Sequence, residues 1–147
     1  MTSRAGFSLD TGDVLTSEPR AGFDAGVVYG VAGPAAWDER LEPHLGVAWL
    51  EEAPGVTLAD AVREDLARLL SLPDAVLLDR QSVALGGLEF VRTFVAEVGP
   101  SGVPTASEQW RTVAGGRRWT VSVTTTLADQ PDWGPRLAAV VATFRPG

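Results

Sequence analysis

Apolar and polar residues alternate through most of the second half of the chain, with glycine-rich breaks between the alternating runs. The alternation is clearest where Trp119, Val121 and Val123 are separated by Thr120 and Ser122. A period of two is typical of strands, and one-sided alternation is typical of an antiparallel sheet with one covered face. The predicted strands run from Ala75 to Leu85, from Leu88 to Val98, from Thr105 to Val113 and from Arg117 to Leu127.

Two of these segments allow a more detailed prediction. Gly86-Gly87 separates the first two strands and can supply the positive φ angles that a two-residue hairpin needs. The segment from Thr105 to Val113 is mostly polar, which suits either an edge strand or a strand that is partly exposed to water. Shorter apolar runs predict strands earlier in the chain, around Phe7 and Leu9, over Val27–Val31 and over Leu45–Leu50.

A helix is predicted between the early and the late strands. Thr57 is a good N-cap, and Asp60 follows at the position of the acid in a capping box. Leu72-Pro73 predicts the end of this helix, because proline disfavours helical geometry in the residue before it. The apolar residues at helical spacing are Leu58, Val62, Leu66, Leu69 and Leu70.

A second helix is predicted close to the C-terminus. Asp132 is the expected N-cap, Pro135 is expected in the first turn, and Arg145 is expected near the negative end of the helix dipole. The expected buried stripe comprises Trp133, Leu137, Val140, Val141 and Phe144.

The order of elements is strands, helix, four strands and helix, without an internal repeat or linker. Runs of strands with few helices favour an α+β fold over a parallel βαβ fold. A length of 147 residues suits one domain that spans residues 1–147. The sequence therefore predicts a mainly antiparallel, twisted sheet flanked by helices.

Several segments also resemble the PsbP-like superfamily of α/β/α sandwiches. Gly6–Asp10 resembles its opening strand, Thr57–Val62 the start of its first long helix, and Leu85–Phe90 its glycine hairpin. Arg118–Thr124, followed by Trp133–Phe144, resembles its closing strand and helix. The superfamily includes plant PsbP, the yeast Ran-binding factor Mog, and bacterial DcrB-type and LpqN-type proteins. The resemblance implies a non-enzymatic adaptor that binds another protein, and it carries over no catalytic residue.

Composition narrows the function classes further. No apolar run approaches the ~20 residues of a membrane span, and the first residues lack the apolar core of a signal peptide. The chain has no Cys, which excludes disulfides, thiolate chemistry and the lipid-bearing cysteine of exported lipoproteins. We therefore expect a cytoplasmic protein. The net charge of −7 argues against nucleic acid as a partner, although all 12 basic residues are Arg.

Catalytic and metal-binding chemistry is sparse. His44 is the one histidine, no serine lies in a Gly-x-Ser-x-Gly elbow, and a structural or solvent-facing role for His44 is favoured. A single histidine does not predict a transition-metal site, and Asp10-Thr-Gly-Asp13 is interpreted as a capped turn. No Gly-x-Gly-x-x-Gly motif opens a helix after a strand, so no cofactor and no metal are expected.

The candidate binding residues are aromatic or cationic. Trp37 and Trp110 are the best candidates for exposed anchors, because one lies in a loop and the other in the polar strand, and Trp is enriched at interfaces. Packing under a surface loop is an alternative for both that is at least equally favoured. Arg92 falls on an apolar strand face, where it pairs with a buried acid, lines a pocket or marks a bulge that changes the register. A structural pair or a position at the rim is favoured. Arg111 completes the candidate set. The tryptophans predicted in the core are Trp49, Trp119 and Trp133.

Together these features predict a non-catalytic, cytoplasmic adaptor or chaperone-like module of bacterial type, with a place in secretion as one setting. A protein or peptide partner would dock on the sheet or on its polar edge strand. One alternative is a small-ligand pocket protein with weak hydrolase activity around His44. Another is a structural homodimer paired through exposed strand edges.

Overall fold

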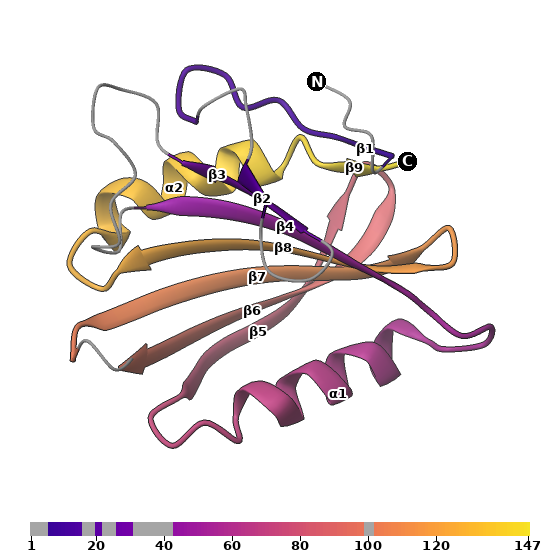
Figure 1. The fold of residues 1–147 in the computed structure, drawn as a ribbon, viewed down its shortest axis with the longest axis horizontal. Coiled ribbons are helices and arrows are strands. Elements are labelled where there is room, and N and C mark those ends of the chain that lie inside the picture. The colour runs from indigo at the N-terminus through magenta and orange to yellow at the C-terminus, as the bar shows by residue number, and fades with distance from the viewer. Residues whose placement is uncertain (1–5, 16–19, 22–25, 31–42, 99–101) are drawn as a thin grey trace.

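The computed structural model describes residues 6–15, 20–21, 26–30, 43–98 and 102–147. Its main feature is a seven-stranded sheet in the order β2-β3-β4-β8-β7-β6-β5, in which every neighbouring pair is antiparallel (Figure 1). The strands are β2 (Arg20–Ala21), β3 (Gly26–Gly30), β4 (His44–Glu51), β5 (Val76–Leu85), β6 (Leu88–Val98), β7 (Pro104–Ala114) and β8 (Arg117–Thr126). This sheet and its two helices confirm the predicted α+β class.

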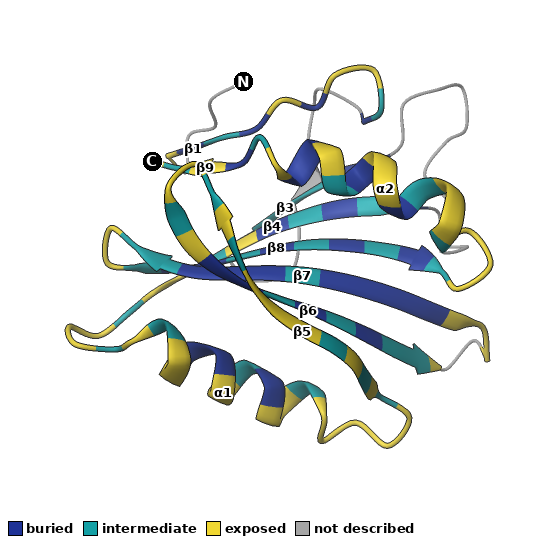
Figure 2. Ribbon diagram, turned by 180° about the vertical axis from the view of Figure 1, so that it is seen from behind, coloured by how far each residue is buried: buried dark blue, intermediate teal, exposed yellow. Residues whose placement is uncertain are grey.

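The two helices lie on opposite faces of the sheet, as both views show (Figure 2). Phe90 on β6 packs in one apolar cluster with Leu137 and Val141 of α2 (Gln130–Val141). Its neighbour Val91 packs in another with Val62 of α1 (Leu58–Leu69). Successive residues of a strand point to opposite faces, so each helix covers its own face. We call these the α2 face and the α1 face. The alternation in β8 suggests one covered face, but helices cover both faces, as the predicted sheet flanked by helices requires.

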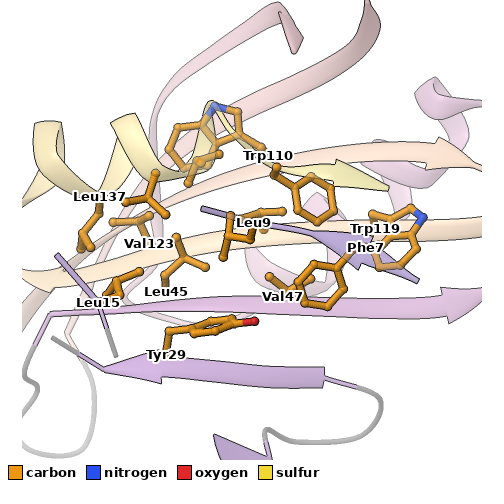
Figure 3. Close-up of a cluster of buried hydrophobic side chains, with 14 of the residues drawn as sticks. Phe7, Leu9, Leu15, Tyr29, Leu45, Val47, Trp110, Trp119, Val123 and Leu137 are labelled. Atoms are coloured by element: carbon orange, nitrogen blue, oxygen red, sulfur yellow. The ribbon is translucent and has the colours of Figure 1, made fainter. Parts of the chain in front are cut away.

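The larger core lies on the α2 face and is rich in aromatic side chains. Phe7, Trp119 and Phe144 have ring centroids 5.7 to 6.0 Å apart, and Trp119 is 1% exposed. Figure 3 shows Trp110, Trp119 and Tyr29 among the side chains of this core. Trp49 and Trp133 are partly buried against it, as the apolar pattern predicts. A separate two-stranded sheet, β1 (Phe7–Ser8) with β9 (Arg145–Pro146), brings the ends of the fold together.

The capping box of α1 is formed as the sequence predicts. The Asp60 backbone N–H donates to Thr57 Oγ1 at 3.1 Å, and the Thr57 N–H donates to Asp60 Oδ2 at 3.3 Å. Two backbone donors that the helix leaves free are thereby satisfied. These hydrogen bonds to Thr57 lower the pKa of Asp60 below its ordinary value of 3.8.

The second helix begins earlier than predicted. Asp129 is its N-cap, Pro131 lies at its start, and Asp132 lies in the first turn instead of capping it. The reason is the tight turn after β8, in which the Asp129 N–H donates to Thr126 Oγ1 and helical hydrogen bonding begins at once. Pro135 consequently falls inside the helix.

The polar strand is central and not at an edge. β7 pairs with β6 on one side and β8 on the other, and seven of its first nine residues are buried. Its two charged side chains form ion pairs, Glu108 with Arg92 on β6 and Arg111 with Asp65 on α1, as described below. The edges of the described sheet are β2 and β5, and β5 carries a bulge between Leu77 and Asp79. The β5–β6 turn confirms the glycine hairpin, with φ of 58° at Gly86 and 82° at Gly87.

Candidate functional site

One end of the sheet exposes large apolar side chains. It lies where β5 and β7 begin, where β6 and β8 end, and where α2 begins (Figure 1). We call its exposed residues the apolar end; each is 40% to 56% exposed, and they are Val76, Leu78, Val98, Val103 and Leu127. Among the remaining described residues, the large hydrophobics that are similarly exposed are Leu70 and Leu72, which precede β5, and Leu50 on β4. Such clustering of exposed apolar side chains is typical of interaction sites.

The strand register places these residues beside one another. Val76 pairs with Ala96, Val98 pairs with Pro104, and the Leu127 N–H donates to the Pro104 carbonyl oxygen at 3.0 Å. Ala96 and Val98 lie an even number of residues from Phe90 on β6, so their side chains point to the same face as Phe90, which is the α2 face. Helix α2 lies mainly over β8 (Figure 2). The part of the α2 face formed by the start of β5 and the end of β6 is therefore not covered by this helix, and Val76 and Val98 are exposed there.

Charged side chains border the apolar end on its inner side. Arg92 donates from Nε and Nη2 to Glu108 Oε2 at 3.0 and 2.8 Å, and from Nη1 to Asp79 Oδ2 at 3.1 Å. Its guanidinium carbon lies 5.9 Å from the ring centroids of both Phe94 and Trp110. The Arg92 side chain is 21% exposed, so the favoured interpretation of a structural pair describes its position.

The cluster around Arg92 is also hydrogen-bonded to β5 and to the start of α2, the two elements that flank the apolar end. Gln81 on β5 donates to Asp79 Oδ2 at 3.0 Å, and Gln130 at the start of α2 donates to Glu108 Oε1 at 3.4 Å. The Glu108 side chain is 8% exposed and receives donors from both Arg92 and Gln130. This network fixes the edge strand and the helix start relative to each other.

A second charged network lies under α1, on the opposite face. Arg118 donates to Glu52 at 2.6 Å, to Asp65 at 2.9 Å and to Glu64 at 3.2 Å, with its own side chain 5% exposed. Burial alone would lower the pKa of Arg118. The hydrogen bonds to Glu52 and Glu64 and the charge of Asp65 outweigh burial and raise that pKa above its ordinary value.

Arg111 is the second buried cation of this network. It donates to Asp65 Oδ2 at 3.2 Å, to Thr93 Oγ1 at 2.8 Å and to the side-chain oxygen of Gln109. Burial lowers the pKa of Arg111, and the charge of Asp65 opposes that shift. Asp65 thus receives both cations, and these ion pairs join α1 to β7 and β8.

The sequence-predicted binding residues occupy different places. Arg92 and Trp110 are neighbours on the α2 face, whereas Arg111 points to the α1 face. Trp110 is 5% exposed and belongs to the core, so the prediction of an exposed Trp110 is wrong. Trp37 lies outside the described residues, and its role stays a prediction. The four residues are therefore not seen to form one surface.

The residues considered for catalysis and metal binding lie elsewhere. His44 begins β4 and is half-buried opposite Thr124, and Asp10 Oδ1 accepts the Gly12 N–H at 3.0 Å within a turn. Within the described ranges, no group of three His, Asp or Glu side chains is placed to hold a metal ion. No helix in the same part of the chain has the length and hydrophobicity to cross a membrane.

Sequence reasoning missed the apolar end because its members were considered one at a time: Val76, Leu78, Val98 and Leu127 fell in predicted strands, and Val103 fell between two of them. Alternation assigns the residues of a strand to one face or the other, and it does not predict where along the strand a covering helix ends. The available signal was the position of Val98 and Leu127 at the ends of predicted strands, next to Gly99-Pro100 and Ala128-Asp129 in the sequence.

Comparison with solved structures identifies the fold. Over all of this chain and 91% of the other, it matches cyanobacterial PsbP (CyanoP) from Synechocystis, with a TM-score of 0.68 and 16% identity. The chain has the PsbP-like fold. The yeast Ran-binding protein Mog1p matches over 96% of this chain and 90% of its own, with a TM-score of 0.62 and 17% identity.

The PsbP-like fold occurs in proteins with different roles. LpqN of Mycobacterium tuberculosis, involved in cell envelope biogenesis, matches over 95% of this chain and 83% of its own, with a TM-score of 0.63 and 18% identity. No family model matches the sequence, and no curated protein is significantly similar to it. At such identities the comparisons establish the fold, and function has to be argued from the site.

Proposed function

We propose that this chain is a non-catalytic protein-binding module, an adaptor or chaperone-like protein, which docks a segment of its partner at the apolar end. The observation that carries the proposal is that Val76 on β5, Val98 on β6 and Leu127 just after β8 gather at one end of the sheet, each more than 40% exposed. Exposed apolar side chains are costly in water, and a partner that covers them gains about 25 cal/mol per Å² of apolar surface.

Two further features support this proposal. Hydrogen bonds among Arg92, Glu108 and Gln130 hold the inner border in place. The border is therefore preorganised, and its side chains lose little conformational entropy on binding. The PsbP-like fold also occurs in the Ran-binding protein Mog1p, which gives a precedent for protein recognition on this scaffold. A bacterial, cytoplasmic setting that includes a role in secretion belongs to the same proposal.

The sequence-predicted residues take distinct parts in it. Arg92 stands at the inner border of the apolar end and can contact the partner there. Trp110 and Arg111 support the sheet from within, because they are 5% and 3% exposed. Trp37 remains a proposed contact.

The test is partner recovery from the source cells with a tagged chain and two variants. We expect the wild type to recover a defined partner, and Val98→Ser/Leu127→Ser to lose it while keeping the circular dichroism of the wild type. Leu50→Ser is the matched control, because Leu50 is 47% exposed on β4, away from the apolar end. Equal recovery by the wild type and the double variant, or recovery of no specific partner, would contradict the proposal.

A further inference from the structure

The segments that build the apolar end carry only acidic charge. Residues 70–79, 94–106 and 125–135 contain no Arg, Lys or His. Asp74, Asp129 and Asp132 are exposed, and the side chain of Asp79 is 43% exposed. The fifth acid of these segments is Glu97, which lies beside Val98 and by alternation points to the α1 face.

Neighbouring arginines neutralise this rim only in part, because Arg92 pairs with Asp79 whereas no ion pair of Asp74, Asp129 or Asp132 is found among the described residues. Arg92 is already paired with Glu108 and Asp79, and Arg80 belongs by alternation to the α1 face. Arg136 lies about one turn beyond Asp132 on α2, with its guanidinium carbon 5.2 Å from the ring centroid of Trp133. The apolar end is therefore an apolar surface inside a predominantly negative border.

From this arrangement we infer that the segment recognised at the apolar end is amphipathic and cationic, with apolar side chains flanked by Lys or Arg. The inference rests on the proposed function and specifies the chemistry of the partner. Apolar side chains of the segment cover Val76, Val98 and Leu127, while its cations face Asp74, Asp129 and Asp132. Complementary charge at such a rim speeds association and selects against acidic segments.

The same charges disfavour the other occupants of an exposed apolar patch. A second copy of this chain would bring an equally acidic rim against the first, and like charges in contact are unfavourable. An anionic membrane surface would be repelled for the same reason, since such surfaces attract basic segments. A cationic protein segment is the occupant whose charge matches the border.

The direct test uses two labelled synthetic peptides of about 18 residues, or five helical turns. Both have the same leucines at helical spacing; one has Lys at the remaining positions and the other has Glu. We expect the Lys peptide to bind the intact protein at least ~10-fold more tightly than the Glu peptide by fluorescence anisotropy. The difference should shrink between about 0.05 M and about 0.5 M NaCl, because salt screens exposed charges.

Charge-matched variants locate the effect. Asp74→Asn/Asp129→Asn should weaken binding of the Lys peptide by about 2- to 30-fold, the range for two exposed charge pairs. Glu51→Gln/Glu89→Gln removes the same charge at exposed positions away from the apolar end and should change affinity by less than about twofold. Equal binding of both peptides, or equal weakening by both double variants, would overturn the inference.

Other outcomes are also decisive. Sedimentation with anionic vesicles, or self-association that Val98→Ser/Leu127→Ser abolishes in light scattering, would show a different occupant and overturn the inference. Recovery of the partner by Val98→Ser/Leu127→Ser would contradict the proposed function itself, whatever the peptides show. A partner that is lost with Val98→Ser/Leu127→Ser but unaffected by Asp74→Asn/Asp129→Asn would overturn the charge inference alone.

Discussion

At the scale of single residues, Trp110 shows how one side chain supports a surface without being exposed on it. Its ring belongs to the α2-face core, and the guanidinium of Arg92 lies 5.9 Å from its centroid. Arg92 in turn is held by Glu108 and Asp79. The buried Trp110 ring therefore supports the Arg92 side chain at the inner border. Phe94 and Val98 follow Arg92 on the same face of β6, toward the apolar end.

Replacement of Trp110 should accordingly affect stability. We expect Trp110→Ala to lower the free energy of unfolding by about 3–5 kcal/mol, because it removes a buried aromatic side chain and leaves a cavity. Urea denaturation followed by circular dichroism measures this change. Leu50→Ala is the control, with an expected change within about 0.5 kcal/mol, since Leu50 is 47% exposed. A loss below about 1 kcal/mol for Trp110→Ala would show that this ring packs less closely than the structure indicates.

At the scale of elements, patterns within a few residues were predicted well. The helix α1 with its Thr57–Asp60 capping box, the Gly86-Gly87 hairpin and the strand β8 all follow from local spacing. The central position of β7 could not be predicted, because its polarity is compensated from distant parts of the chain. Arg111 pairs with an acid 46 positions away, and the adjacent strand's Arg118 with one 66 positions away. The apolar end likewise depends on the register of β5, β6 and β7 and on the position of α2 over the sheet. The spacing of apolar residues along the sequence predicts neither of these.

The capping box gives a prediction for α1. Thr57→Ala should destabilise the protein by about 1 kcal/mol, because one backbone donor of the first turn loses its acceptor. Urea denaturation at neutral pH measures the difference from the wild type. The control is Ser71→Ala, a hydroxyl beyond the C-terminus of the same helix that donates to the Arg68 carbonyl. A larger loss for Ser71→Ala than for Thr57→Ala would contradict the role of the box.

Asp60 adds a pH dependence of known sign. Its pKa is lowered in the folded protein, so its ionised form contributes stability that is fully present above the ordinary value of 3.8. This contribution is lost as pH falls through the lower, folded-state pKa. Asp60→Asn should therefore be less stable than the wild type at neutral pH, and the difference should narrow below about pH 4. A difference that stays constant from pH 7 to pH 3 would contradict the assignment.

At the scale of the whole molecule, the two outer layers are joined to the sheet by different forces. Helix α2 packs on a large apolar core that includes Leu137 and Val141. Helix α1 contributes Val62, Leu66 and the partly buried Leu58 to a smaller apolar cluster, and Asp65 ties the helix to two buried arginines. The α1 layer should consequently respond more strongly to loss of charge.

Arg118→Met tests this difference. We expect a loss of about 3–5 kcal/mol, because Glu52 and Asp65 would remain largely buried with one cation fewer. Hydrogen exchange should report faster opening of α1 than of α2. Arg63→Met removes an exposed pair with Asp60 and should cost no more than about 1 kcal/mol. Equal losses for the two variants would mean that the buried network contributes no more than a surface pair.

The pairing of β1 with β9 has a practical consequence. Phe7 lies opposite Pro146, so the first and last described strands are neighbours on the side of the molecule away from the start of β7 (Figure 1). A linker that precedes β1 and one that follows β9 would therefore leave the described fold from neighbouring strands. The molecule could be immobilised in one orientation, with the starts of β5 and β7 facing the bulk solution.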